Sequence, residues 1–248
     1  MQSFLKLLAF PAVIVLSGCV STGSTTARTE SVFARQSNNP IENVAWYRDQ
    51  AELGNASAQN ILGYMYLTGQ GMNQDFDEAV RWFRMAAEQG YPRAIYNLGC
   101  MYAEGNGVNQ NYEEAIRLFE KAVVLGDDHA QNNLAYMYVM GRGVERDSAK
   151  AAELFRKSAD QGYAVAQHSL GFMYQYGIYF ATDYKEAAQW YRKSAEQGNA
   201  EAQIALGEMY ETGQGVSQNY DEARKWYIKA AEQGDSRAHS KLDHIGRY

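Results

Sequence analysis

Few side chains in this sequence could carry out chemistry, and their spacing does not assemble a metal or catalytic centre. The two cysteines, Cys19 and Cys100, do not make a disulfide framework. No Ser–His–Asp arrangement can be picked out from the sequence. The histidines are scattered without the spacing of metal ligands: His129, His168, His239 and His244. We therefore expect no catalytic residues, no metal ion and no cofactor.

The net charge of the chain bears on the class of partner. The 248 residues carry a formal charge of −6, and the sequence pI is about 5.3. Binding to nucleic acid needs a clustered positive surface that can neutralise phosphates. We therefore expect no nucleic-acid partner.

The cysteine in the most informative context is Cys19. Residues 1–18 are typical of a signal peptide, with Lys6 followed by an apolar run that is too short to span a bilayer. The run ends in Leu16-Ser17-Gly18-Cys19, which resembles a bacterial lipobox. The resemblance implies cleavage before Cys19 and acyl chains on its thiol and new amino group. The alternative is a plain signal peptide followed by a cysteine that arose by chance.

The residues after Cys19 favour a protein that is attached to a membrane only through its lipid. Val20 at the next position implies, by the same resemblance, sorting to the outer membrane of a Gram-negative cell, facing the periplasm, with surface exposure left open. Residues 19–38 are rich in Ser and Thr, which cannot bury apolar area. We expect a lipidated, flexible tether there and localisation in the bacterial cell envelope.

The rest of the chain, residues 39–248, is organised by a period of 36 residues. A glycine closes each period: Gly54, Gly90, Gly126, Gly162, Gly198 and Gly234. A fixed period of this length is typical of a solenoid built from supersecondary units. The units it predicts are 55–90, 91–126, 127–162, 163–198 and 199–234.

Each unit reads as a pair of α-helices. In the first unit Ala58, Leu62 and Tyr66 form one apolar stripe, and Ala79 and Phe83 lie on another. Residues that can cap a helix stand before each second helix, and most are followed three positions later by glutamate, as in a capping box: Asp75, Asn111, Asp147, Asp183 and Asn219. Residues 40–53 and the apolar face at the C-terminal end predict an opening and a closing cap helix.

Small residues within the first helices predict how the helices cross. They lie between the leucine and the Met-Tyr pair of each unit: Gly63, Gly99, Ala135, Gly171 and Gly207. A residue with little or no side chain at this position lets the facing helix approach closely, and a larger one should overpack.

These features resemble the Sel1-like repeat, a relative of the tetratricopeptide repeat, over residues 55–234. The motif A-x3-L-G-x-M-Y-x2-G-x-G-V followed by Y-x-E-A-x2-W-Y-x-K-A-A-E-Q-G carries the resemblance. It implies an all-α, right-handed α-solenoid whose first helices line a concave face, and a non-catalytic role in binding another protein or an extended peptide.

The alternative is a β-lactam-binding or β-lactam-hydrolysing protein, or one that binds peptidoglycan. One branch of the family is associated with β-lactams and carries a pair of cysteines in each repeat. The present units have no such pairs, and the mature sequence has no S-x-x-K motif of the serine β-lactamase kind.

Alignment with the tetratricopeptide pattern predicts which side chains face the concave groove. Aromatic rings and amides gather there, a mixture that suits an extended peptide, although the same residues could instead pack between neighbouring first helices. The predicted groove residues are Asn60, Tyr64, Tyr96, Asn97, Asn132, Asn133, Tyr136, His168 and Phe172.

Two further stretches stand out from the repeat. Glu201, Glu208 and Glu211 could orient a basic stretch of a partner, or they could simply be solvated. Ile178 and Tyr179 add apolar side chains to a turn that is otherwise polar, so local packing or a partner contact is expected there.

Overall fold

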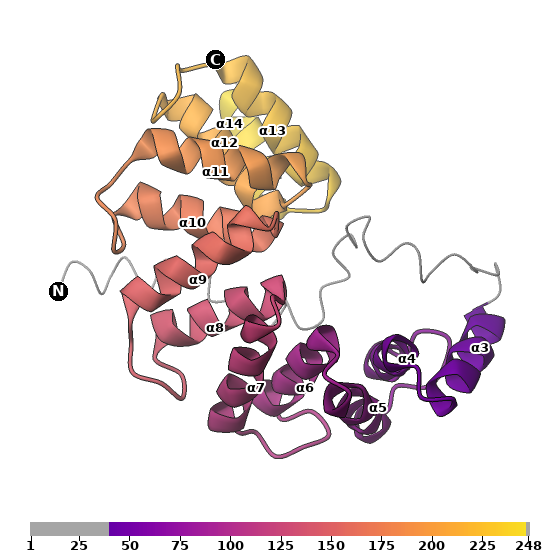
Figure 1. The fold of residues 1–248 in the computed structure, drawn as a ribbon. Helices are drawn as coiled ribbons and strands as arrows, with labels where there is room; N and C mark the ends of the chain where they lie inside the picture. Colours follow the sequence, from indigo (N-terminus) through magenta and orange to yellow (C-terminus); the bar gives the residue numbers. More distant parts are fainter. Residues whose placement is uncertain (1–39, 247–248) are drawn as a thin grey trace. The chain divides into compact units, whose positions relative to one another are not determined.

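The structure is a computed structural model that describes residues 40–246, without the side chains of residues 40–42 (Figure 1). The predicted signal peptide, the lipidation site Cys19 and the tether of residues 19–38 lie outside the described residues. No helix within residues 40–246 combines the length and the apolar character that a membrane span requires.

Residues 40–246 form twelve α-helices and no strand, which confirms the predicted opening helix, five helix pairs and closing helix. The helices are α3 (Pro40–Glu52), α4 (Ala56–Thr68), α5 (Phe76–Glu88), α6 (Pro92–Glu104), α7 (Tyr112–Val124), α8 (Asp128–Met140), α9 (Ser148–Asp160), α10 (Ala164–Tyr176), α11 (Tyr184–Glu196), α12 (Ala200–Thr212), α13 (Tyr220–Glu232) and α14 (Ser236–Ile245).

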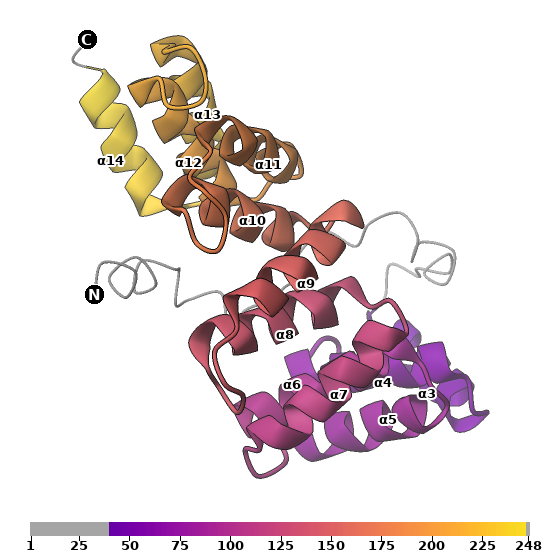
Figure 2. The same ribbon diagram turned by 60° about the vertical axis from the view of Figure 1, so that its left-hand side comes forward.

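The helices fall into two compact units. The first unit comprises residues 40–134 and 142–144, and the second comprises residues 135–141 and 145–246, so that α8 contributes to both. In the first unit each helix from α3 to α7 packs on the next one along the chain. In the second unit the same holds from α9 to α14 (Figure 2).

Each second helix begins at the predicted capping residue. The side chain of Asp75 accepts a hydrogen bond from the backbone N–H of Glu78 at 3.0 Å, and the equivalent residues cap α7, α9, α11 and α13. In a capping box the glutamate side chain would accept a hydrogen bond from the backbone N–H of the cap. Here the N–H of Asp75 donates instead to the carbonyl of Tyr66 at 2.9 Å, and Glu78 pairs with Arg81 at 2.8 Å. The loop of each repeat is therefore closed by a backbone bond from the cap to the first helix.

The glycines inside the first helices mark close helix contacts, as the sequence predicts. A Cβ atom on Gly63 would lie 2.8 Å from the ring of Phe83, and one on Gly207 would lie 2.5 Å from the ring of Tyr227. In the four pairs that have this glycine, an aromatic ring of the second helix therefore packs directly on the backbone of the first.

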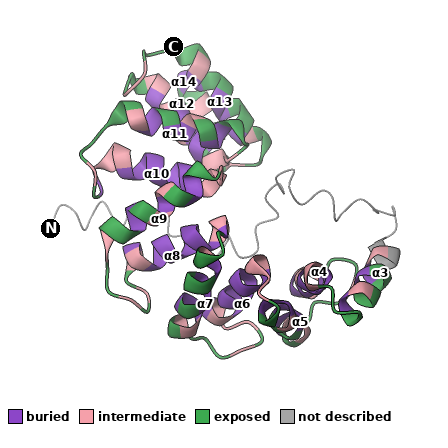
Figure 3. Cartoon of the chain, in the orientation of Figure 1, coloured by how far each residue is buried: buried purple, intermediate pink, exposed green. Residues whose placement is uncertain are grey.

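The core consists of alanine, larger aliphatic and aromatic side chains between the helices. Figure 3 shows buried residues on the inner helix faces and exposed residues on the outer faces of the second helices. Near the start, Val44, Tyr47, Leu62 and Trp82 belong to one apolar cluster. In the second unit, Ile245 of α14 packs in a cluster with residues of α12 and α13. The first and last helices thus cover apolar faces at the ends of the described chain.

Candidate functional site

Most of the predicted groove residues are buried. Eight of the nine expose at most 8% of their surface: Asn60, Tyr96, Asn97, Asn132, Asn133, Tyr136, His168 and Phe172. Tyr64 is half-buried. Binding of a partner through these side chains stays a prediction, and the structure shows which neighbours they contact within the chain.

Hydrogen bonds link successive first helices through residues that are 33 or 37 positions apart, close to one period. In the first unit the amide nitrogen of Asn97 donates to the side-chain oxygen of Asn60 at 2.8 Å, and that of Asn133 donates to the hydroxyl of Tyr96 at 3.3 Å. In the second unit the hydroxyl of Tyr136 lies 2.8 Å from that of Ser169. The first helices are thus joined by buried polar contacts, which is the packing alternative that the sequence leaves open.

A second set of polar links was missed by the sequence analysis. The amide of Gln89 donates to the side chain of Gln59 at 2.7 Å, and Gln59 donates to the carbonyl of Ala51 at 3.0 Å. Gln197 and Gln167 repeat the pair at 2.8 Å. Glutamine recurs at both positions in several units, and this recurrence was the available signal. These amides satisfy backbone groups where one helix ends and the next begins.

Two ionisable groups on the first helices, His168 of α10 and Glu104 of α6, have strongly shifted pKa values. Burial lowers the pKa of His168 to about 4, and its Nδ1 has no hydrogen-bond partner among the described residues. Burial also raises the pKa of Glu104 to about 7, against the opposing effect of a hydrogen bond from Asn106. Both groups favour the neutral form because their surroundings solvate charge poorly.

Arg93 lies between two carboxylates at the start of α8. Its guanidinium is 3.0 Å from Asp127 and 2.9 Å from Asp128, and His129 lies 2.8 Å from Asp128. The side chains of residues 127–129 are close enough to share a cation, but Arg93 and the backbone N–H groups of α8 already bind their carboxylates. Burial opposes ionisation of Asp128, yet His129 and Arg93 outweigh it and lower the pKa of the carboxyl to about 2. The cluster is an ion-pair network that starts a helix.

The predicted acidic stretch contacts a basic face of the same chain. Glu201 receives two hydrogen bonds from Arg237, at 2.9 and 2.6 Å, and Glu208 pairs with Lys241 at 2.8 Å. Glu211 lies 3.8 Å from His244 and accepts a hydrogen bond from Tyr227 at 2.7 Å. The basic side chains of the closing helix α14 therefore contact the carboxylates of α12.

Reversing one of these charges should loosen the closing helix. In an Arg237→Glu variant, the new carboxylate would face Glu201 and Asp235, and like charges repel at this distance. We expect faster amide hydrogen exchange across α14 and unchanged exchange in α9 to α11. An Arg237→Lys variant, which keeps the charge, serves as the control. Unchanged exchange in α14 of the Glu variant would show that its apolar contacts alone hold the helix.

The loop between α10 and α11 brings together the two residues predicted to contact a partner. Ile178 is buried, whereas Tyr179 exposes 60% of its surface. Tyr179 also has a φ of 66°, and it is the only non-glycine residue in the described chain with a positive φ. Its ring stands edge-on to that of Phe180, with ring centres 5.1 Å apart.

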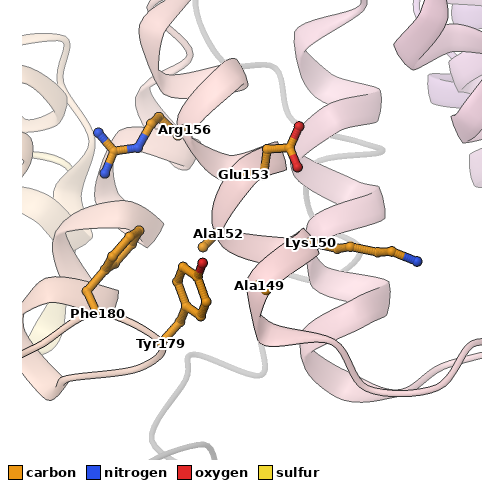
Figure 4. A pocket seen from close by; sticks show the side chains of 7 residues that line it. All are labelled: Ala149, Lys150, Ala152, Glu153, Arg156, Tyr179 and Phe180. Carbon is orange, nitrogen blue, oxygen red and sulfur yellow. The ribbon is translucent and has the colours of Figure 1, made fainter.

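A pocket of about 390 Å³ separates this loop from α9 in the second unit. Tyr179 and Phe180 form one wall, and residues of α9 form the other, among them Ala149, Ala152 and Arg156 (Figure 4). Lys150 and Glu153 complete the lining. The guanidinium of Arg156 lies 5.4 Å from the ring centre of Phe180 and donates a hydrogen bond to the hydroxyl of Tyr174. The pocket thus combines aromatic surface with a cation.

The pattern of one known family matches the repeats. The Sel1 repeat matches residues 56–91, 92–127, 128–163, 164–199 and 200–235. A search of curated proteins found no match.

Solved structures show the same architecture. A Sel1 repeat protein from Oxalobacter formigenes is 31% identical, with a TM-score of 0.75, over 83% of this chain and 89% of that protein. The protective antigen c5321 of uropathogenic Escherichia coli is 38% identical, with a TM-score of 0.72, over 85% of this chain. The match spans 45% of the length of that antigen. The immunity protein Pa5087 of Pseudomonas aeruginosa is 18% identical, with a TM-score of 0.57, over 93% of this chain and 81% of that protein, and shows likeness of fold alone.

Proposed function

The chain belongs to the Sel1 repeat family, and on this basis we propose that it is a lipid-anchored scaffold of the bacterial cell envelope that binds another protein. Members of this family are generally protein-interaction scaffolds, and their fold is typically non-catalytic. The anchor rests on Cys19 and the residues before it, and the partner is held by the repeats of residues 39–248.

One observation carries the proposal: packing positions repeat while exposed positions differ. The alanine in the first turn of each second helix recurs in all five units, fully buried: Ala79, Ala115, Ala151, Ala187 and Ala223. Two positions later every side chain is exposed, and its chemistry varies among the units, being cationic in three, acidic in one and an amide in one: Arg81, Arg117 and Lys225, Glu153, and Gln189. A binding surface on a repeat protein requires packing residues that recur and exposed side chains that differ between the units.

The proposal is tested by identifying what the full chain contacts in its membrane. Tagged full-length protein is crosslinked in intact source cells and purified from membranes, and the attached proteins are identified by mass spectrometry. We expect one protein to be enriched relative to an unrelated tagged lipoprotein, and reciprocal tagging of that protein to recover this chain. A Cys19→Ser variant should move to the soluble fraction, because acyl chains supply the membrane affinity.

Two results would argue against the proposal. Recovery of the same proteins with the unrelated lipoprotein would contradict the scaffold role. Retention of the Cys19→Ser variant in the membrane would contradict the lipid anchor.

A further inference from the structure

We propose that the pocket between α9 and the α10–α11 loop binds a protein segment that presents an apolar side chain next to a carboxylate. This inference rests on the proposed scaffold function and names the kind of partner that one surface of the scaffold fits. Four features support it: the exchange of residues that opens the pocket, the backbone of Tyr179, the charge of Arg156 and the dimensions of the cavity.

In three other places the equivalent turn closes on the preceding repeat. A Cβ atom on Gly107 would lie 2.5 Å from the carbonyl oxygen of Phe76, and one on Gly215 would lie 2.0 Å from that of Tyr184. Gly143 is equally close to Tyr112, at 2.6 Å from its Cβ. In each case a glycine of the turn packs against an aromatic residue that begins a second helix.

The α9 repeat exchanges these two residue types. Ser148 begins α9 where the helices before and after it begin with Tyr112 and Tyr184, and Tyr179 stands where the other turns have glycine. The aromatic residue of the pair therefore lies in the loop and not at the start of the helix. Ala152 is smaller than Val80 of α5 and Ile116 of α7 at this position, and α11 has the equally small Ala188. Small residues on one side and aromatic rings on the other leave the observed cavity.

Tyr179 combines a costly backbone conformation with a largely exposed aromatic ring. A residue with a Cβ atom in the left-handed region costs about 1–2 kcal/mol relative to glycine. Tyr179 exposes 60% of its surface, so most of its ring is left available to a partner. Strained backbone of this kind, on an exposed aromatic residue beside a pocket, is typical of a binding site.

The positive charge of Arg156 indicates which group the partner presents next to its apolar side chain. Arg156 forms no ion pair with any carboxylate of the described residues, whereas Glu153 is already paired with Lys157 at 2.7 Å. Figure 4 shows Arg156 beside Phe180, and the ammonium end of Lys150 pointing away from both aromatic rings. A carboxylate on the partner would therefore complete the hydrogen bonds of Arg156, and its apolar neighbour would cover Tyr179 and Phe180.

The dimensions fit a short protein segment. A volume of about 390 Å³ is near the lower end of the usual range for ligand pockets and accepts one large side chain with its neighbours. Such a pocket supplies an anchor at the centre of a wider interface.

The chain offers a matched variant that closes the pocket without disturbing the repeat. The exchange Ser148→Tyr with Tyr179→Gly restores the pair seen at Tyr112 with Gly143. A second variant, Arg156→Gln, removes the charge but keeps a donor for Tyr174. Arg192→Gln is its control, because Arg192 makes the same bond to Tyr210, at 2.5 Å, beside a turn that has glycine. Melting curves followed by circular dichroism establish that each variant folds.

The probes are short fluorescein-labelled peptides that carry adjacent Asp and Phe, in both orders, in a Gly/Ser background. Binding to the full-length protein is followed by fluorescence anisotropy. We expect at least one Asp/Phe peptide to bind with a Kd below about 1 mM, and peptides with Lys for Asp or Ala for Phe to bind about tenfold more weakly or worse. The double exchange and Arg156→Gln should weaken binding about tenfold, and Arg192→Gln should leave it unchanged.

Three outcomes would overturn the inference. They are the absence of binding by both Asp/Phe peptides up to about 1 mM, equal binding of the Lys peptides, and equal binding by a folded double-exchange variant. Failure here is separable from failure of the scaffold function. If crosslinking in cells recovers the same partner with the double-exchange variant, the scaffold role stands and this pocket is not its contact.

Discussion

Replacement of Gly207 by valine is expected to lower the free energy of unfolding by about 3 kcal/mol. A Cβ atom at this position would lie 2.5 Å from Cε1 of Tyr227 and 2.8 Å from Cδ1, so the ring must move. The ring is fully buried, and its hydroxyl donates to Glu211 at 2.7 Å. Displacement of the ring would therefore disturb the packing of α12 on α13 and a hydrogen bond at once.

The measurement is a thermal melt of the full-length protein. A loss of about 3 kcal/mol corresponds to a decrease in Tm of roughly 10 °C for a chain of this size. Gly207→Ala serves as the graded comparison, because the better helix propensity of alanine, about 1 kcal/mol, partly offsets its smaller clash. Alanine is tolerated at the equivalent position in the third repeat, where Ala135 is fully buried. A valine variant with the same Tm as the wild type would show that the ring of Tyr227 can move freely.

Replacement of His168 by isoleucine is expected to stabilise the protein, most strongly in acid. The imidazole is buried, stacks near Tyr191 at 5.4 Å between ring centres, and leaves Nδ1 without a hydrogen-bond partner. Isoleucine already occupies this position in the next repeat, where Ile204 is buried. Removal of an unsatisfied buried polar group is worth about 1 kcal/mol at neutral pH.

The effect of His168 grows as the pH falls. Burial lowers its pKa in the folded state to about 4, with a smaller opposing contribution from Glu201 and a smaller supporting one from Arg237. In the unfolded chain the pKa returns to about 6.5, so the unfolded state binds the proton first. The contribution of the neutral imidazole is present above pH 6.5 and is lost as the pH falls to 4, by about 3 kcal/mol in total.

Urea unfolding at several pH values between 4 and 7 checks this dependence. The wild type should lose stability through this window more steeply than the His168→Ile variant. A His239→Gln variant is the control, because His239 is exposed and its replacement should leave the slope unchanged. If the free energy of unfolding depends on pH equally in the wild type and in His168→Ile, the acid sensitivity arises elsewhere in the chain.

The repeat and its local structure were predictable because each depends on residues that are near in sequence. The 36-residue period, the capping by Asp75 and its equivalents, and the helix contact at Gly63 are confirmed. Caps and turns are decided within a few residues, and the period places them five times over.

The candidate site was less predictable because it depends on distances between elements. Whether Asn97 faces a partner or Asn60 depends on how closely α6 and α4 approach, and periodicity does not report that distance. The role of the acidic stretch was hidden for the same reason, since Glu201 meets Arg237 only when α14 folds back on α12. At Tyr179 the departure from glycine was visible in the sequence, but the compensating Ser148 and the pocket required the structure.

The backbone bond that closes each repeat has a consequence for how such genes change length. The N–H of the capping residue donates to the carbonyl of the tyrosine nine residues earlier in every repeat, as Asp75 does to Tyr66 and Asn219 to Tyr210. A recombination event that joins two equivalent positions recreates this bond at the junction. A single inserted codon between tyrosine and cap would break it. Descendants of this gene should therefore differ by whole repeats, and their loops should keep one length.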